Sequence, residues 1–128
     1  MRRNAKLQVK LITTGARSGE PRLVTLYAWT DHERSHQDDG SLILVGSSAG
    51  APRHPAWVHN LRAHPAVSVK RGLETEPMDA REVTDPDEYA ELWAFCADRF
   101  PQYETYRRRT ARQIPIFVLT PRSEASSE

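Results

Sequence analysis

Apolar and polar residues alternate along much of the chain, and a period of two is typical of half-buried strands. Six segments have this character or are short continuous apolar runs: 7–12, 22–29, 42–45, 66–71, 78–83 and 114–119. Gly72 lies between two of them and is expected to join them as a strand pair. The pattern therefore predicts about six strands.

Helical signals occur in three other places. Residues 84–87 (Thr-Asp-Pro-Asp) combine a capping hydroxyl, here Thr84, with a proline and acids, which is a typical helix start. Apolar side chains then recur at helical spacing at Tyr89, Leu92, Trp93, Cys96 and Phe100. Pro55 is predicted to lie in the first turn of a helix that continues through 56–63, and 103–112 is a candidate for a short third helix.

These elements predict one α+β domain over residues 1–128, with two or three helices beside the strands. Most links between strands are too short to contain a crossover helix, so a mostly antiparallel barrel is favoured over a doubly wound sheet. Residues 31–40 are polar and are expected to form an exposed hairpin loop. The ends of the chain, 1–6 and 122–128, are expected to be flexible.

Composition narrows the class of protein. The formal net charge is +1 with 27% charged residues, which argues against nucleic-acid binding driven by bulk charge. The single cysteine, Cys96, excludes an internal disulfide framework, and its position among apolar residues predicts a packed thiol. Apolar runs stay well below the roughly 20 residues of a transmembrane helix, and Gln8 and Lys10 interrupt any secretory signal. We therefore expect a cytoplasmic protein.

The first candidate site is the segment 15–22, Gly-Ala-Arg-Ser-Gly-Glu-Pro-Arg. Its glycines expose backbone N–H groups, Ser18 adds a hydroxyl, and Arg17 and Arg22 supply charged donors. This mixture suits a phosphate or a carboxylate. The segment lacks the Lys-Ser/Thr ending of a nucleotide P-loop. An ordinary glycine- and proline-containing loop with surface arginines is the alternative interpretation.

The second candidate site is the segment 46–64. The small residues Gly46–Ala51 would let a ligand approach the backbone closely, and the helix after Pro55 would present N–H groups to an anion. Arg53 and His54 lie beside that helix start. Trp57 could pack against a ligand ring, although filling the core is the better default for this residue alone.

A metal site is not expected. Three histidines, His54, His59 and His64, recur every five residues, but five residues turn a helix by roughly 500°, so successive rings point in different directions. With one cysteine and no His-Glu-x-x-His motif, zinc is disfavoured.

The sequence leaves the roles of two other groups of residues open. The arginines 107–109 together with Arg112 could bind phosphates, or could form a solvated or anion-facing helix face. Tyr103 and Tyr106 could orient or protonate a substrate, or could simply pack.

Taken in order, these residues resemble the actinobacterial deazaflavin-dependent nitroreductase and quinone reductase family. The resemblance runs from about Leu11 to Pro121. Four pieces carry it: Thr13–Arg22, then Gly50–Leu61 (Gly-Ala-Pro-Arg-His-Pro-Ala-Trp-Val-His-Asn-Leu), then Pro101–Tyr106, and finally Ile114-Pro115. The second piece is the most specific. The family's fold is a split β-barrel with helices, which agrees with the predicted strand count.

The resemblance implies coenzyme F420, an 8-hydroxy-5-deazaflavin with a phosphate and a polyglutamate tail, which carries the hydride itself. It gives Arg17, Arg22 and Arg53 an anionic partner and assigns Ser18 and the Ser47–Ala51 backbone to the phosphate and ring. The complete cofactor-binding set implied is Arg17, Ser18, Arg22, Ser47, Ser48, Ala49, Gly50, Ala51, Arg53, His54 and Trp57. Tyr106 and Ser47 become hydrogen-bond donors to a reducible oxygen, and Tyr27 and Tyr103 become aromatic walls of the substrate pocket.

The leading hypothesis is therefore an F420H2-dependent reductase of quinone-like or nitroaromatic acceptors. The alternatives are an FMN-binding barrel oxidoreductase, a non-catalytic deazaflavin carrier and, less favoured, a nucleic-acid module using the arginine cluster. A homodimer and a peripheral contact with a membrane are left open. Three residues depart from the family pattern: Ala16 replaces a basic residue, Val58 an aromatic and Phe100 a tyrosine.

Overall fold

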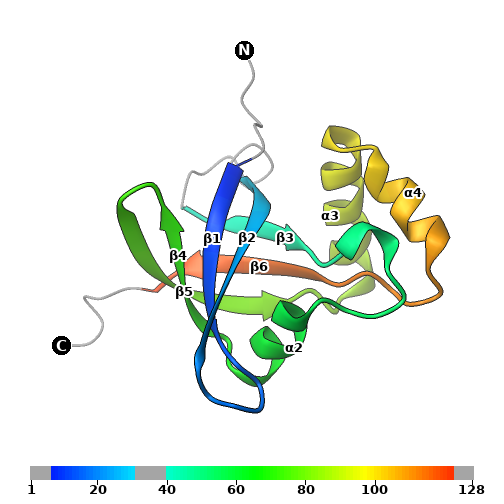
Figure 1. Ribbon diagram of the computed structural model, residues 1–128. Helices are drawn as coiled ribbons and strands as arrows, with labels where there is room; N and C mark the ends of the chain where they lie inside the picture. The colour runs from blue at the N-terminus through cyan, green and yellow to red at the C-terminus, as the bar shows by residue number, and fades with distance from the viewer. Residues whose placement is uncertain (1–6, 31–39, 123–128) are drawn as a thin grey trace.

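The computed structural model describes residues 7–30 and 40–122. The strands are β1 (Leu7–Thr14), β2 (Pro21–Thr30), β3 (Leu42–Val45), β4 (Ala66–Arg71), β5 (Glu74–Glu82) and β6 (Ile116–Pro121). The helices are η1 (Ser48–Gly50), a 3-10 turn, and the α-helices α2 (Ala56–Ala63), α3 (Pro86–Arg99) and α4 (Gln102–Arg109). Strands and helices thus follow one another as expected for an α+β chain (Figure 1).

The strands close into a barrel in the order β1-β2-β3-β6-β5-β4. Every pair is antiparallel, and the pairing of β1 with β4 closes the ring. The predicted antiparallel barrel is therefore confirmed. β1 and β2 form its longest ladder, from Leu7 opposite Ala28 to Thr14 opposite Pro21. The turn between these strands, residues 15–20, projects from the end of the barrel that lies near α2 (Figure 1).

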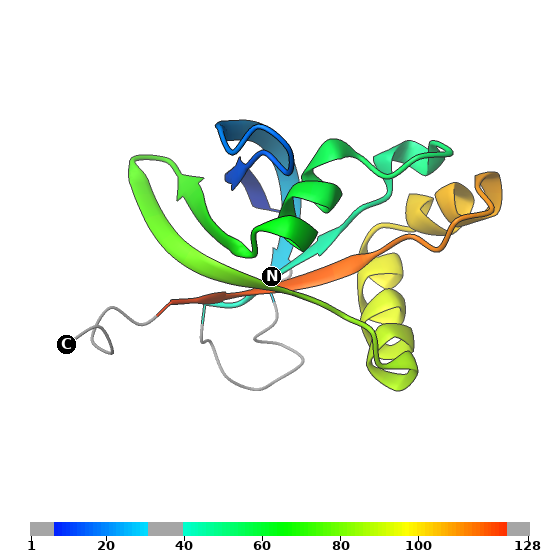
Figure 2. The ribbon, with the colours of Figure 1, turned by 90° about the horizontal axis from the view of Figure 1, so that it is seen from below.

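The core has two parts because β3 and β6 are covered on both faces. The inner core fills the barrel, where Leu44 and Phe117 pack with Trp57 and Leu61 of α2. The outer core contains Ile43, Val45, Ile116 and Val118 on the opposite strand faces, packed with residues of α3 and α4. Burial on both faces explains why 42–45 is a continuous apolar run rather than an alternating one. Figure 2 shows α3 and α4 together on one side of the barrel.

The helix starts differ from the predictions by one residue. Asp85, not Thr84, caps α3, and its carboxylate accepts the N–H of Glu88 at 2.9 Å. The helix begins at Pro86, whose fixed φ suits the first helical position, so the cap is the residue before it. Pro55 is likewise the N-cap of α2, in an extended conformation, rather than a first-turn residue.

The C-terminal elements also shift. α4 ends at Arg109 instead of 112, and β6 covers 116–121 instead of 114–119. Pro115 has no N–H to contribute to a strand ladder, and its carbonyl accepts the N–H of Gly46 instead. Cys96 is fully buried in the outer core, which confirms the prediction of a packed thiol. The expected hairpin loop at 31–40 and the flexible ends fall almost entirely outside the described residues.

Candidate functional site

Two adjoining cavities open beside α2. The first has a volume of about 820 Å³ and the second about 430 Å³. The first is lined by Thr13, Gly15, Ala16, Arg17, Ser18, Arg22, Leu23, Val24, Pro55, Ala56, Trp57, His59 and Asn60. The second is lined by Val24, Thr25, Leu26, Tyr27, Val45, Ser47, Ser48, Ala49, Pro55, Trp57, Phe100, Tyr103 and Tyr106. Val24, Pro55 and Trp57 line both, so the cavities meet at the Trp57 side chain.

The turn 15–20 forms one rim of the first cavity. The N–H of Gly15 donates to the carbonyl of Glu20 at 2.8 Å, and Gly19 adopts a positive φ of 72° that few other residues tolerate. The Ser18 hydroxyl accepts bonds from the Glu20 N–H at 3.1 Å and from the Arg22 guanidinium at 3.2 Å. Arg22 and Ser18 are therefore held together at the cavity rim.

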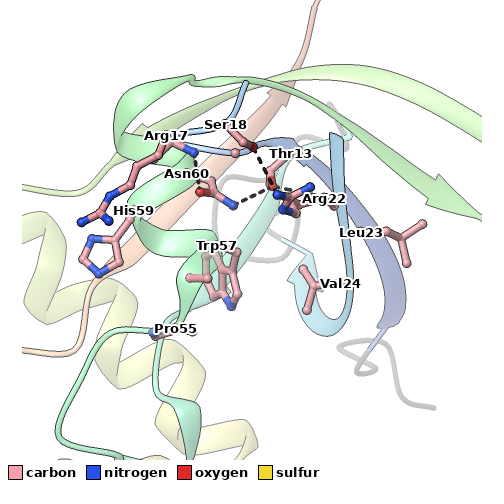
Figure 3. Close-up of a pocket in the computed structure, with 13 residues that line it drawn as sticks. Thr13, Arg17, Ser18, Arg22, Leu23, Val24, Pro55, Trp57, His59 and Asn60 are labelled. Atoms are coloured by element: carbon pink, nitrogen blue, oxygen red, sulfur yellow. Dashed lines mark hydrogen bonds between the residues drawn. The ribbon is translucent and has the colours of Figure 1, made fainter. Parts of the chain in front are cut away.

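Asn60 on α2 fixes this turn to the rest of the molecule. Its carbonyl oxygen accepts the N–H of Ala16 at 2.9 Å, and its NH₂ group donates to the Thr13 hydroxyl at 3.1 Å (Figure 3). Asn60 and Thr13 are 8% and 2% exposed, so the bond between them is buried, whereas the bond from Ala16 is only partly buried. The amide therefore sets the distance between the turn and α2. The sequence contained Asn60 within the most specific motif but gave it no role.

Arg17 extends from the same turn on the side where His59 lies (Figure 3). It has no hydrogen-bond or ion-pair partner within residues 7–30 and 40–122, so its guanidinium donors are available to an anion. The predicted donors Arg17, Ser18 and Arg22 thus share one cavity. Arg53 does not join them, since it is exposed and lines neither cavity.

The second cavity is aromatic at one end. The buried indole of Trp29 donates its N–H to the Tyr103 hydroxyl at 3.0 Å, and burial raises the pKa of Tyr103 to about 12. The phenol is therefore protonated at neutral pH, and its own proton remains for another acceptor. Tyr106 packs edge-on against Tyr103 at 6.4 Å between ring centroids. Tyr27, which is 49% exposed, lines the cavity from β2.

The loop Gly46–Ala51 forms another wall of the second cavity, and its backbone is strained. Ser48, Ala49 and Gly50 have φ values of 45°, 54° and 81° in succession. A left-handed conformation costs a residue with a side chain about 1 kcal/mol or more, so the surroundings must hold it. The sequence predicted a plain loop here, because nothing about Ser48 or Ala49 marks a left-handed turn. The structure has the 3-10 turn η1 instead.

Hydrogen bonds from Arg112 stabilise this loop conformation. Its guanidinium donates to the carbonyls of Gly46 at 3.1 Å, Ser47 at 2.9 Å and Ala51 at 2.9 Å. The sequence grouped Arg112 with the arginines 107–109 as a phosphate-binding or solvated cluster. That grouping is wrong for Arg112, because its donors are committed to the protein's own backbone.

His54 is the fourth partner of Arg112. The guanidinium lies 2.8 Å from His54 Nδ1, and since arginine has no acceptor, this nitrogen must accept the bond. Burial, followed by the nearby Arg112 charge, lowers the pKa of His54 from its ordinary value of 6.5. His54 lines neither cavity. Among residues 7–30 and 40–122, no group of three ligating side chains could hold a metal ion.

Comparison with known proteins shows the family to which this chain belongs. The model of the family described as F420H(2)-dependent quinone reductase matches residues 2–121. An F420H(2)-dependent quinone reductase of Mycobacterium tuberculosis (strain H37Rv) is 39% identical over 116 residues, covering 88% of this chain and 72% of that protein. The chain belongs to the F420H(2)-dependent quinone reductase family. The resemblance read from the motifs is thereby confirmed.

Solved structures agree with the quinone reductase family assignment. One, titled as an F420-H2 dependent reductase, has a TM-score of 0.70 and 34% identity, covering 88% of this chain and 92% of that one. Another, described as a domain-swapped dimer, has a TM-score of 0.71 and 34% identity, covering 88% of this chain and 78% of that one. In this family member, no helix of the described segments is long and apolar enough to cross a membrane.

The predicted site residues of this quinone reductase family member fall into two groups. Most line one of the two cavities: Arg17, Ser18, Arg22, Tyr27, Ser47, Ser48, Ala49, Trp57, Tyr103 and Tyr106. Arg53, His54, Gly50 and Ala51 do not line either cavity. Trp57 is 7% exposed and packs against Phe117, so it fills the core. It also lines both cavities, where it could contact a ligand ring.

Proposed function

We propose that this protein transfers a hydride from reduced coenzyme F420 to a quinone-like acceptor, with the cofactor across the junction of the two cavities. One observation carries the proposal beyond family membership. Cationic and hydroxyl donors line the first cavity, phenols line the second, and Trp57 lines both. A cofactor with an anionic tail and a planar reactive ring requires such a gradient from charged to aromatic surroundings.

The donors present fit this cofactor. Its phosphate and carboxylates need cationic partners, and Arg17, with uncommitted donors, and Arg22, held by Ser18, supply them at the first cavity. Its ring needs an apolar wall, and Val24, Pro55 and Trp57 supply one. The cavity volumes of about 820 and 430 Å³ are in the range of small-molecule sites. We assign the loop Gly46–Ala51 to the edge of the ring.

When bound, the reduced deazaflavin supplies the hydride, which carries two electrons and one proton to the acceptor. The protein must hold the acceptor at the ring and provide a proton to the acceptor oxygen that gains negative charge. We assign the Tyr106 hydroxyl and the Ser47 hydroxyl to hydrogen bonds with that oxygen. Tyr103 and Tyr27 form the aromatic walls. Because burial raises the pKa of Tyr103 to about 12, its phenol is protonated at neutral pH and adds no negative charge that would repel the reduced product.

We also propose nitroaromatic compounds as acceptors, because they are planar like quinones and carry oxygens that gain charge on reduction. Phe100 packs edge-on against Tyr103 at 4.8 Å and offers the second cavity a ring without a hydroxyl. This composition favours flat, apolar acceptors over strongly polar ones. A panel that compares menadione with a nitroaromatic compound would rank the two classes by kcat/KM.

The test is turnover by the purified protein. With F420H2 and menadione, we expect menadione-dependent formation of oxidised deazaflavin above the rate without protein. Binding of F420 without turnover over a panel of quinones would indicate a carrier and contradict the enzyme assignment. A parallel titration with FMN should give no tight binding. Tight FMN binding together with no F420 binding would overturn the cofactor assignment.

We also propose that the protein forms a homodimer. A structural neighbour at 34% identity is described as a domain-swapped dimer, and Leu23 on β2 is 60% exposed although its side chain is large and apolar. Light scattering coupled to size-exclusion chromatography measures the mass directly. A mass of one chain, about 14.6 kDa, at micromolar concentration would contradict the dimer.

A further inference from the structure

Among the arginines of residues 7–30 and 40–122, Arg112 is distinguished by its backbone contacts. Its side chain bonds Ala51 through Nε, Gly46 through Nη1 and Ser47 through Nη2, so every nitrogen donates to a backbone carbonyl of the same loop. Nη1 also donates to His54 Nδ1. Gly46 and Ser47 precede the left-handed turn and Ala51 follows it. One rigid planar group therefore joins both ends of the loop.

The loop is fixed from its other side by α4. A Cβ added to Gly50 would lie 2.8 Å from the Tyr106 carbonyl oxygen, so glycine is required for this close approach, and its φ of 81° is also left-handed. Figures 1 and 2 both show η1 beside α4. The loop thus lies between Arg112 and the backbone of Tyr106.

The same loop contributes Ser47, Ser48 and Ala49 to the wall of the second cavity, which Tyr106 also lines. Arg112 itself lines neither cavity. Whatever it contributes to binding at this cavity must therefore pass through the loop. A guanidinium that only supplied positive charge to an anionic ligand would not need three backbone acceptors on one loop.

We propose that Arg112 is a positioning residue, whose planar guanidinium holds Gly46–Ala51 in the left-handed turn that keeps Ser47 in the wall of the second cavity, which Tyr106 also lines. The expected change in KM rests on the proposed function, whereas the expected change in the loop conformation does not. We predict that lysine cannot replace arginine here, since an ammonium group cannot serve three carbonyls and His54 in this fork geometry.

The experiment compares Arg112→Lys and Arg112→Met with the control Arg122→Met. Arg122 is a suitable control because it is also partly buried and donates to a backbone carbonyl, that of Met78 at 2.7 Å, with Asp79 as a second partner. It lines neither cavity. Hydrogen exchange of the loop amides, measured without cofactor, reports directly how strongly Arg112 stabilises the loop. The KM and kcat for menadione report the effect of this stabilisation on turnover.

Both Arg112 variants should speed exchange in segment 46–51 and raise the menadione KM about tenfold or more, while Arg122→Met changes neither. Unchanged exchange in this segment would overturn the proposal, as would an Arg112→Lys variant with wild-type KM, because charge alone would then suffice. If Arg112→Met does not unfold cooperatively, the amide exchange and the menadione KM of Arg112→Lys alone decide whether Arg112 positions the loop. Absence of turnover in the wild type would refute the proposed function, and the exchange measurement would still decide the role of Arg112.

Discussion

Asn60→Leu tests how the turn 15–20 is positioned. Leucine has the same branching and the same number of side-chain heavy atoms as asparagine, so the substitution removes the two bonds of the amide without opening a cavity. The Ala16 N–H loses its acceptor at 2.9 Å, and the Thr13 hydroxyl loses its donor at 3.1 Å. Thr13 keeps only a long contact of 3.4 Å to the carbonyl of Arg22.

The magnitude follows from burial. Asn60 and Thr13 are 8% and 2% exposed, so water cannot fully replace the donor that Thr13 loses, although it can reach the exposed Ala16 more easily. A net hydrogen bond contributes about 1 kcal/mol, and a buried polar group left without a partner costs about 1–3 kcal/mol. Transfer of the larger apolar leucine surface out of water offsets part of this loss. We expect the free energy of unfolding to fall by about 1–3 kcal/mol.

Urea unfolding of the wild type, Asn60→Leu, Thr13→Val and the double variant measures this effect. The double variant should be less destabilised than the sum of the single variants by at least about 0.5 kcal/mol, because both substitutions remove the same bond. Asn60→Leu should also weaken anion binding at the first cavity, since the turn carries Arg17 and Ser18. A loss of less than about 0.5 kcal/mol with full additivity would refute the reasoning.

Four further predictions concern single residues. Arg17→Ala should weaken F420 binding by about 1–3 kcal/mol in a fluorescence titration, and an unchanged Kd would remove Arg17 from the site. Tyr106→Phe should lower kcat for menadione more than it weakens cofactor binding; the opposite pattern would misplace this phenol. Tyr103→Phe leaves the Trp29 N–H, buried at 3% exposure, without its acceptor and should cost about 1–3 kcal/mol in urea unfolding. The pKa of His54 is lowered in the folded state, so the unfolded chain binds its proton more readily and stability falls as the pH drops below about 6.5; His54→Asn should flatten this part of the profile, and an unaltered profile would contradict it.

Much of the barrel could be predicted because its signals are local. Alternation, the run Leu42–Val45 and the turn at Gly72 each depend on neighbours in the sequence. The segment 15–22 could be read as an anion site for the same reason, since its glycines, hydroxyl and arginines are contiguous. The cavity does bring Arg17, Ser18 and Arg22 together.

The remaining features depend on contacts between distant parts of the chain. Asn60 and Thr13 are separated by 47 positions, and Arg112 and Gly46 by 66. A side chain that bonds a remote backbone carbonyl leaves no periodic pattern, so Arg112 resembled a member of a surface cluster. Arg53 adjoins the helix start in sequence, yet it lines neither cavity, so its role in cofactor binding stays a prediction.

The position of the cofactor is the central claim, and a crystal structure of the protein with bound F420 tests it most directly. We predict the phosphate and tail beside Arg17, Ser18 and Arg22, the ring against Trp57, and the reactive face toward Tyr106. A ring bound outside the junction of the two cavities, or a tail that makes no contact with Arg17 or Arg22, would contradict the account.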